Sequence, residues 1–221
     1  SSTAIRQFLA MAQILAHVDA DAPIRMLIAE CEEPATILAA LYFAKLFGID
    51  DKVDVSPLFE TETALEHGGR LLDALLAEEE YRAYARRRGR VAIQTGFSDA
   101  GRFVGQLPAS LAIERLQGRL AQAMADLADR NPAPLVMIAG LLSTKDAAAT
   151  LGHFKGLAQA LYAVPIHNSL AARPAEEVAE AARGAGLVAE VASSVEQALR
   201  TIAARDWPVP PRILICGSLY L

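Results

Sequence analysis

The sequence predicts an α/β protein in which seven mainly parallel strands form one open, doubly wound, Rossmann-like sheet inside a three-layer sandwich. Short apolar runs alternate with longer segments of helical periodicity, which is the pattern of parallel strands joined by crossover helices. A length of 221 residues, 53% of them apolar, is enough to build the core. The expected strands are Ile24–Ala29, Val53–Phe59, Val91–Phe97, Leu135–Gly140, Leu161–Ile166, Leu187–Val191 and Arg212–Gly217.

Helix start and stop signals separate these runs. Pro34 suits a first helical turn, Pro174 is followed by two glutamates, and each of the stretches 143–146 and 194–197 reads as a capping box. Glycines follow three helical stretches, where the chain is expected to leave the helix. They are Gly48, Gly89 and Gly186.

The spacing of the strands changes along the chain. The first four runs start about 29, 38 and 44 residues apart, whereas the later runs follow at about 25 residues. The change falls near residues 129–134, a Pro-rich stretch. If the first half dictates that consecutive strands are neighbours, the alternative architecture is a TIM-barrel-like closure.

Composition excludes several classes of protein. A formal charge of −5 disfavours nucleic acid as a partner, and no apolar run reaches the length that a membrane span needs. Two cysteines without a near partner fit a reducing cytoplasm. The chain starts at Ser1 without Met and stops at Leu221, which predicts a piece cut from something longer. Unpaired sheet edges leave homo-oligomer formation open.

Three motifs in the first half share a resemblance. They are Val-Ser-Pro-Leu-Phe-Glu-Thr at 55–61, Glu-Glu-Glu-Tyr-Arg at 78–82 and Thr-Gly-Phe-Ser-Asp-Ala-Gly-Arg at 95–102. In this order and at these distances they resemble the barrel of phosphoenolpyruvate carboxylase, over about residues 2–125.

This resemblance implies a metal site. Glu60 and Asp99 stand where the family's strand-end carboxylates hold a divalent metal, and such oxygen ligands suit Mg²⁺ or Mn²⁺. Two carboxylates make a weak site, and both residues can equally be helix N-terminal or loop acids. Arg102 stands near a cationic residue of the family and is either a contact for phosphate or carboxylate, or a surface arginine at a helix start.

The second half carries a different resemblance. Three stretches of it resemble the C-terminal Rossmann-like domain of folylpolyglutamate synthase/dihydrofolate synthase, over about residues 126–221. They are residues 135–146, residues 162–166 and the ending Arg-Ile-Leu-Ile-Cys-Gly-Ser-Leu-Tyr-Leu. The resemblance leaves Ser218 as the one matched residue on the substrate side. A turn residue is the alternative interpretation of Ser218.

Together the resemblances predict a single chimeric domain, with a half-barrel fragment at 1–125, a Rossmann-derived fragment at 126–221 and a crossover within 108–130. The carboxylase's catalytic His and Arg-bearing loop and the synthase's phosphate loop are missing. We therefore expect a designed or recombined scaffold that is not an enzyme and has no catalytic or cofactor-binding residues. The alternatives are a residual divalent-metal or phosphate/anion binder, and a divergent natural enzyme of either parent class.

The other polar residues predict no site. The four histidines are scattered without ligand spacing, which argues against zinc, and the arginines at 82–90 suit a helix C-terminus. The motif at 145–146 caps a helix, and both cysteines are expected to be structural or idle thiols. The histidines and cysteines are His17, His67, His153, His167, Cys31 and Cys216.

Overall fold

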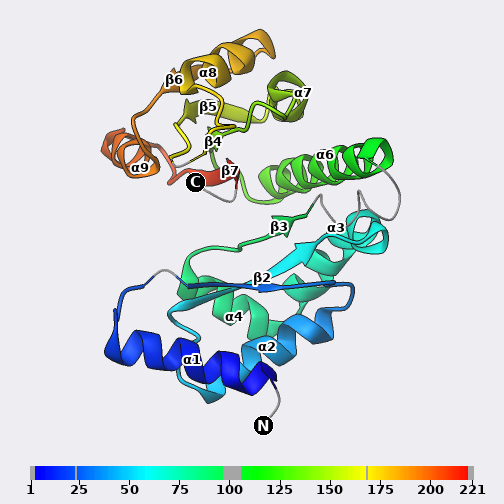
Figure 1. Cartoon of the computed structure of the whole chain (residues 1–221). Coiled ribbons are helices and arrows are strands. Elements are labelled where there is room, and N and C mark those ends of the chain that lie inside the picture. The colour runs from blue at the N-terminus through cyan, green and yellow to red at the C-terminus, as the bar shows by residue number, and fades with distance from the viewer. Residues whose placement is uncertain (1–2, 23, 97–105, 168, 219–221) are drawn as a thin grey trace. The chain divides into compact units, whose positions relative to one another are not determined.

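The computed structural model describes residues 3–22, 24–96, 106–167 and 169–218 (Figure 1). Contacts divide the chain into two compact units, Ser1–Leu116 and Gln117–Leu221. Each unit has its own parallel sheet, and the long helix α6 (Gln106–Arg130) begins in the first unit and ends in the second. None of the helices in the described residues combines the length and the apolar character needed to cross a membrane.

Helices and strands alternate in the first unit. Its three parallel strands have the order β1-β2-β3, so β2 is central. β2 pairs with β1 from Val53 opposite Ile24 to Pro57 opposite Ile28, whereas β3 lies opposite only the last two residues of β2. The elements are α1 (Thr3–His17), β1 (Ile24–Ile28), α2 (Pro34–Leu46), β2 (Val53–Phe59), α3 (Glu62–Ala77), α4 (Glu79–Arg88) and β3 (Gln94–Thr95).

The core of the first unit lies around β2. Val53, Val55 and Phe59 are buried, and α2 and α3 both contact the strand. Gly68 lets α3 pack closely here, because a methyl group at that position would lie 3.0 Å from the Phe59 ring. Leu116 of α6 is fully buried beside the same glycine.

The second unit has four parallel strands in the order β6-β5-β4-β7. Successive strands run from β4 outward to β6, and the chain then returns to the other side of β4 to form β7. The strand order therefore reverses at β4, as it does in doubly wound sheets. The elements are β4 (Leu135–Gly140), α7 (Ala147–Gly152), β5 (Ala158–Ala163), α8 (Ala175–Gly184), β6 (Ala189–Val191), α9 (Val195–Ala204) and β7 (Arg212–Gly217).

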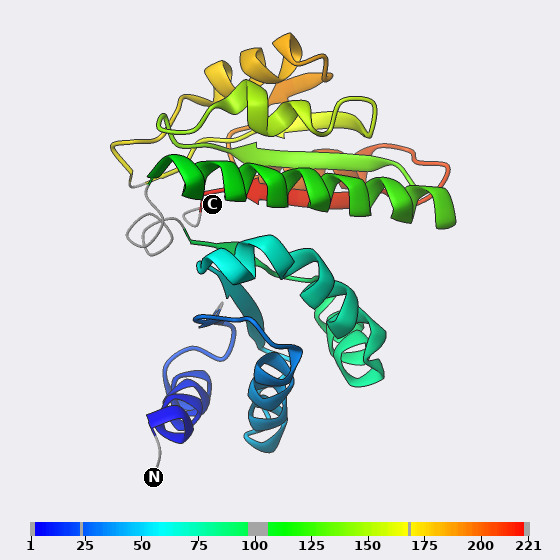
Figure 2. The same ribbon diagram turned by 90° about the vertical axis from the view of Figure 1, so that its right-hand side faces the viewer.

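Helices cover both faces of this sheet (Figure 2). All six residues of β4 are buried, and the first five alternate between two apolar clusters. Met137 belongs to the cluster with α6, α7 and α8, whereas Ile138 belongs to the cluster with α9. This two-sided burial explains why the strand is apolar throughout.

The α/β class, the parallel strands and several boundaries are confirmed, and β2, β4 and β7 match their predicted ranges residue by residue. The single seven-stranded sheet is wrong, and so is the alternative of barrel closure, because the strands form two separate open sheets. Physically, β3 is only two residues long and pairs only with β2 in the described part of the chain.

The helix signals are mostly confirmed. Pro34 begins α2, Ser194 caps α9 by accepting from the Gln197 amide at 3.1 Å, and Gly89 ends α4 with a left-handed φ of 66°. The start predicted at residue 143 is wrong by a turn, since α7 begins after Asp146. Asp146 caps α7 by accepting from the Ala149 amide at 3.0 Å.

Candidate functional site

The carboxyl ends of the three strands in the first unit meet at one edge of the sheet. β1 is followed by an acidic segment at residues 30–33, β2 by Glu60 and Thr61, and β3 by Gly96. The Gly96 amide donates to the Phe59 carbonyl at 2.8 Å, which extends the pairing of β3 with β2 by one residue. In α/β folds this edge is where ligands bind.

Glu60 is the buried acid of this edge. Only 9% of the residue is exposed. Its Oε1 accepts from the Glu30 amide at 3.0 Å, and no described residue donates a hydrogen bond to its Oε2. Gly96 lies against the side chain, because a methyl group on Gly96 would be 2.7 Å from the Glu60 Cβ. Within the described chain, the carboxylate is thus held at Oε1 and has no hydrogen-bond donor at Oε2.

The segment after β1 is held against the start of α3. The Thr61 hydroxyl donates to Glu32 at 2.6 Å and also accepts from the Ala64 amide at 3.1 Å, which caps α3. Cys31 is fully buried, and this burial raises the pKa of its thiol to about 11. The thiol is therefore protonated at neutral pH, and Cys31 anchors the segment without being a nucleophile.

The edge is negatively charged. In the described ranges, no ion pair joins Glu30, Glu32, Glu33 or Glu60 to a cationic side chain. Those ranges also hold no group of three or more His, Cys, Asp or Glu residues that could bind a metal. A cation at Glu60 would therefore take at most one further ligand of these types from the described chain. Mg²⁺ and Mn²⁺ sites commonly have such a small set of protein ligands.

The predicted site residues have different outcomes. Asp99 and Arg102 lie outside the described residues. Ser218 lies in the second unit, directly after β7, where its amide donates to the Gly140 carbonyl at 3.0 Å and so continues the pairing of β7 with β4. Of the two that the structure describes, Glu60 therefore lies at the carboxyl edge of the first sheet and Ser218 in the second unit.

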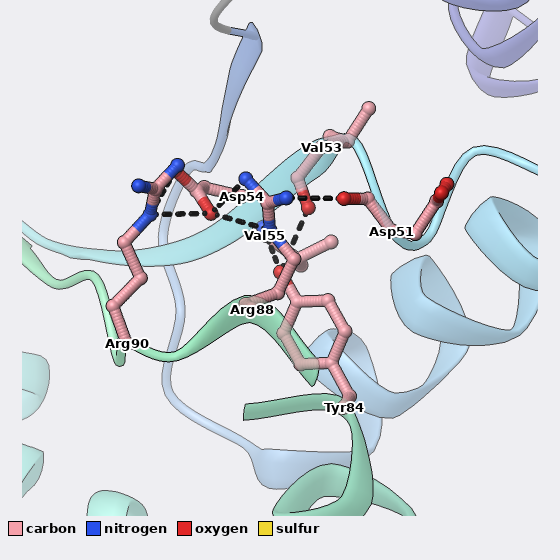
Figure 3. A network of polar contacts seen from close by, with 7 residues as sticks. All are labelled: Asp51, Val53, Asp54, Val55, Tyr84, Arg88 and Arg90. Carbon is pink, nitrogen blue, oxygen red and sulfur yellow. Dashed lines mark hydrogen bonds and ion pairs between the residues drawn. The ribbon is translucent and has the colours of Figure 1, made fainter. Parts of the chain in front are cut away.

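The arginine run does more than complement the end of α4. Arg88 and Arg90 both bind Asp54, which is 5% exposed near the start of β2 (Figure 3). Arg90 hydrogen-bonds to both carboxylate oxygens of Asp54, and this hydrogen bonding raises the pKa of the Arg90 guanidinium. Sequence reasoning missed this network, although an aspartate inside an otherwise apolar strand was the signal. Both arginines pair with the same buried carboxylate, so we assign the network to stability.

Tyr84 completes the same network by capping β2. Its hydroxyl accepts from the Val55 amide at 2.7 Å and donates to the Val53 carbonyl at 2.9 Å. Those two groups are the ones that one residue of a neighbouring parallel strand would bind. Since β3 is too short to reach this part of β2, the tyrosine takes that place. Burial is the main cause that raises the pKa of Tyr84.

Replacing Tyr84 with phenylalanine is expected to destabilise the first unit by about 2 kcal/mol, because two buried backbone groups lose their partner. Urea denaturation followed by circular dichroism measures the loss. Tyr42→Phe is the matched control, since Tyr42 is 61% exposed and should change stability by less than about 0.5 kcal/mol. Equal losses in the two variants would contradict the capping role.

Comparison with known proteins identifies the first unit. The family model of phosphoenolpyruvate carboxylase matches residues 1–128. The chain belongs to the phosphoenolpyruvate carboxylase family. The carboxylase of Tolumonas auensis is 29% identical over 128 residues, which are 58% of this chain and 14% of that protein. The carboxylase of Thermus sp. (strain 71) is 38% identical over 92 residues, 39% of this chain and 11% of that protein.

One carboxylase aligns over a longer part of the chain. The carboxylase of Chromohalobacter salexigens is 27% identical over 173 residues, which cover 78% of this chain and 17% of that protein. Since the family model covers 128 residues, this alignment includes residues beyond the family match. The chain therefore spans only about a sixth or less of the length of these carboxylases.

Two solved structures are distantly similar. FolC of E. coli in complex with DHPP and ADP has a TM-score of 0.42 at 14% identity, over 84% of this chain and 67% of that chain. The bifunctional folylpolyglutamate synthase/dihydrofolate synthase of Yersinia pestis, complexed with AMPPNP and Mn ion, has a TM-score of 0.41 at 12% identity, over 78% of this chain and 61% of that one. Likenesses at this level carry no argument about the present chain.

The comparisons correct one expectation. The chain was expected not to be an enzyme, but its sequence relatives are named phosphoenolpyruvate carboxylases, so it belongs to a family of enzymes. The expectation rested on missing motifs. Their absence from a chain that spans so little of its relatives does not bear on the family's activity. The carboxylase resemblance of the first half is confirmed, whereas a chimeric origin is not shown.

Proposed function

We propose that the first unit supplies a divalent-cation site of a phosphoenolpyruvate carboxylase, with Glu60 as a metal ligand. The observation that supports this most is the state of the Glu60 carboxylate. It is nine-tenths buried, it has one oxygen held by the Glu30 amide, and its other oxygen has no donor in the described chain. A buried carboxylate without a cation is costly, so this oxygen suits a cationic partner.

The chemistry of the edge narrows the choice of cation. The polar side chains described at this edge, Thr61 and Glu32, carry oxygen, and the thiol of Cys31 is buried and protonated. Oxygen ligands with few carboxylates favour Mg²⁺ or Mn²⁺ over Zn²⁺. Asp99 is the proposed second carboxylate, because it follows β3 in the sequence and stands at the position of the family's other strand-end carboxylate. Waters and substrate oxygens would complete the coordination.

The proposed substrate is a small phosphorylated carboxylate of the kind for which the relatives are named. A bound divalent cation would neutralise charge on the oxygens of such a molecule. The residues of this chain would orient it, with Glu60 and Asp99 on the cation and Arg102 on a phosphate or carboxylate group. Residues beyond this chain would supply the rest of a complete carboxylase site.

Replacing Glu60 with glutamine tests the proposal directly. The change keeps the side chain's size but removes its charge, so we expect Mn²⁺ affinity to fall at least about tenfold, since a charged contact at a buried site is worth more than about 1.4 kcal/mol. Isothermal titration calorimetry of the whole chain with Mn²⁺ measures it. Asp99→Asn should weaken binding in the same direction.

Glu33→Gln is the matched control for that titration. Glu33 is an exposed carboxylate at the same edge, and its side chain makes no capping hydrogen bond to α2. We expect Glu33→Gln to bind Mn²⁺ nearly as the unmodified chain does. If the Glu33 and Glu60 variants lose affinity equally, the edge attracts cations only by its general charge and the assigned ligand is wrong.

We also propose that the chain joins fragments of two families. The position of the boundary supports this, because the contact boundary at residues 116 and 117 lies close to the end of the family match at residue 128. The alignment with the Chromohalobacter salexigens carboxylase, which is longer than the family match, counts against it. Aligning residues 129–221 separately with carboxylases from many organisms tests it. A carboxylase that matches this stretch as well as it matches residues 1–128 would contradict a recombined origin.

A further inference from the structure

Glu30 has a strained backbone next to the candidate metal ligand. Its φ is 49°, and it is the only non-glycine residue with a positive φ in the described part of the chain. Side chains other than those of glycine, asparagine and aspartate adopt this left-handed conformation at a cost. Strain of this kind persists only where the surrounding structure enforces it, and it is concentrated at functional sites.

The surrounding structure enforces the conformation from both sides. β1 ends at Ile28, two residues before Glu30, and the next residue, Cys31, is fully buried. Glu32 is tied to Thr61, and Pro34 begins α2. The chain therefore has to turn sharply between a strand and a buried side chain.

The turn places the backbone amide of Glu30 beside Glu60, the candidate metal ligand. The Glu30 amide donates to Oε1 of Glu60 at 3.0 Å, and the left-handed φ of the same residue turns the chain from this amide toward the buried Cys31. The glutamate side chain has several rotatable bonds, and an unbound glutamate would populate many orientations. The hydrogen bond from Glu30 selects one of them, and Gly96 leaves room for the side chain in that orientation.

We infer that Glu30 is a positioning residue, whose left-handed backbone holds Glu60 so that Oε2 is presented to the cation before it arrives. This inference rests on the proposed function, because it concerns the same site. Pre-organisation improves affinity by reducing the entropy lost when the ligand side chain is immobilised. Glu30 itself acts through its backbone amide and need not touch the metal.

A matched pair of variants separates the backbone effect from the charge of Glu30. Glu30→Val and Glu30→Asn remove the same negative charge, but valine strongly disfavours the left-handed conformation and asparagine tolerates it. The free Mn²⁺ signal in electron paramagnetic resonance, recorded during titration of the whole chain, gives the affinity. We expect Glu30→Val to bind about three- to tenfold more weakly than Glu30→Asn, since fixing one long side chain changes affinity by about that factor.

A second readout follows the hydrogen bond itself. Hydrogen exchange of the residue 30 amide, followed by NMR on ¹⁵N-labelled protein without metal, reports whether this amide is hydrogen-bonded. We expect a protected amide in the unmodified chain and in Glu30→Asn, and faster exchange in Glu30→Val. Equal protection in Glu30→Val and Glu30→Asn would show that the left-handed backbone is not needed for the hydrogen bond. If Glu30→Val does not fold, Glu30→Ala, which lacks the β-branch, takes its place.

The Glu30 and Glu60 variants together separate a failure of the positioning role from a failure of the metal site. If Glu60→Gln loses Mn²⁺ binding but Glu30→Val and Glu30→Asn bind equally, the positioning role is overturned and the metal site stands. If Glu60→Gln binds as the unmodified chain does, the metal site itself is overturned. Weaker binding by Glu30→Val than by Glu30→Asn, together with loss by Glu60→Gln, supports both.

Discussion

Replacing Asp54 with alanine should lower the free energy of unfolding by about 3 kcal/mol, because it leaves a largely buried arginine without its counter-charge. The Asp54 side chain is 7% exposed, and that of its partner Arg88 is 12% exposed. Arg88 binds Asp54 at 2.9 Å, while Arg90 contacts the other oxygen at 2.7 Å. Urea denaturation followed by circular dichroism measures the loss.

A neighbouring pair provides the control. Arg87, on the same helix, pairs with Asp50 at 2.6 Å, but the two side chains are 44% and 21% exposed. Solvent-accessible pairs of this kind contribute about 0–1 kcal/mol, so Asp50→Ala should have a small effect. If Asp50→Ala and Asp54→Ala destabilise the protein equally, the buried network does not have the structural role assigned to it.

Replacing Gly96 with alanine should damage both the fold and the site. The new methyl group would lie 2.7 Å from the Glu60 Cβ and 3.4 Å from its Oε2, so the glutamate must move. Forcing an extra carbon into a packed position costs about 1–3 kcal/mol. Moving Glu60 also breaks the arrangement of its two oxygens, and we expect Mn²⁺ affinity to fall at least about tenfold. Thermal melting and Mn²⁺ titration measure the two losses.

Gly69→Ala is the control for this substitution. Gly69 lies inside α3, in the same unit, and a methyl group there would meet nothing within 4 Å. Alanine is favoured over glycine in a helix by about 0.5–1 kcal/mol, so this variant should be slightly more stable and should bind Mn²⁺ unchanged. A Gly96→Ala variant that keeps full Mn²⁺ affinity would show that the position of Glu60 does not matter for the metal.

Much of the fold could be predicted from local patterns. β4 is buried on both faces and reads as an uninterrupted apolar run, and Gly89 marks the end of α4 because the chain turns there with a left-handed φ. These signals lie within a few residues of what they determine. The division into two sheets has no such local signal: β3 is two residues long and, in the described part of the chain, pairs only with β2.

The candidate site, like the fold, could be predicted only where the signal is local in the sequence. Family motifs pointed to Glu60, which follows β2 at the carboxyl edge of the first sheet, and its role as a metal ligand stays a prediction. The hydrogen bond from the Glu30 amide to Glu60 and the contact of Gly96 with Glu60 could not be predicted. Each of them joins segments that are about 30 residues or more apart in the sequence. Asp54 could have been singled out as the acid of an apolar strand, but its two arginine partners become visible only when α4 is placed beside β2.

An anomalous difference map from crystals of the whole chain grown with Mn²⁺ tests the metal site most directly. Our account predicts a peak about 2.1 Å from the Glu60 Oε2, with Oε1 still bound to the Glu30 amide. The peak should be missing from crystals of Glu60→Gln grown in the same way. Manganese that occupies other sites while the Glu60 carboxylate stays without a peak would contradict the account.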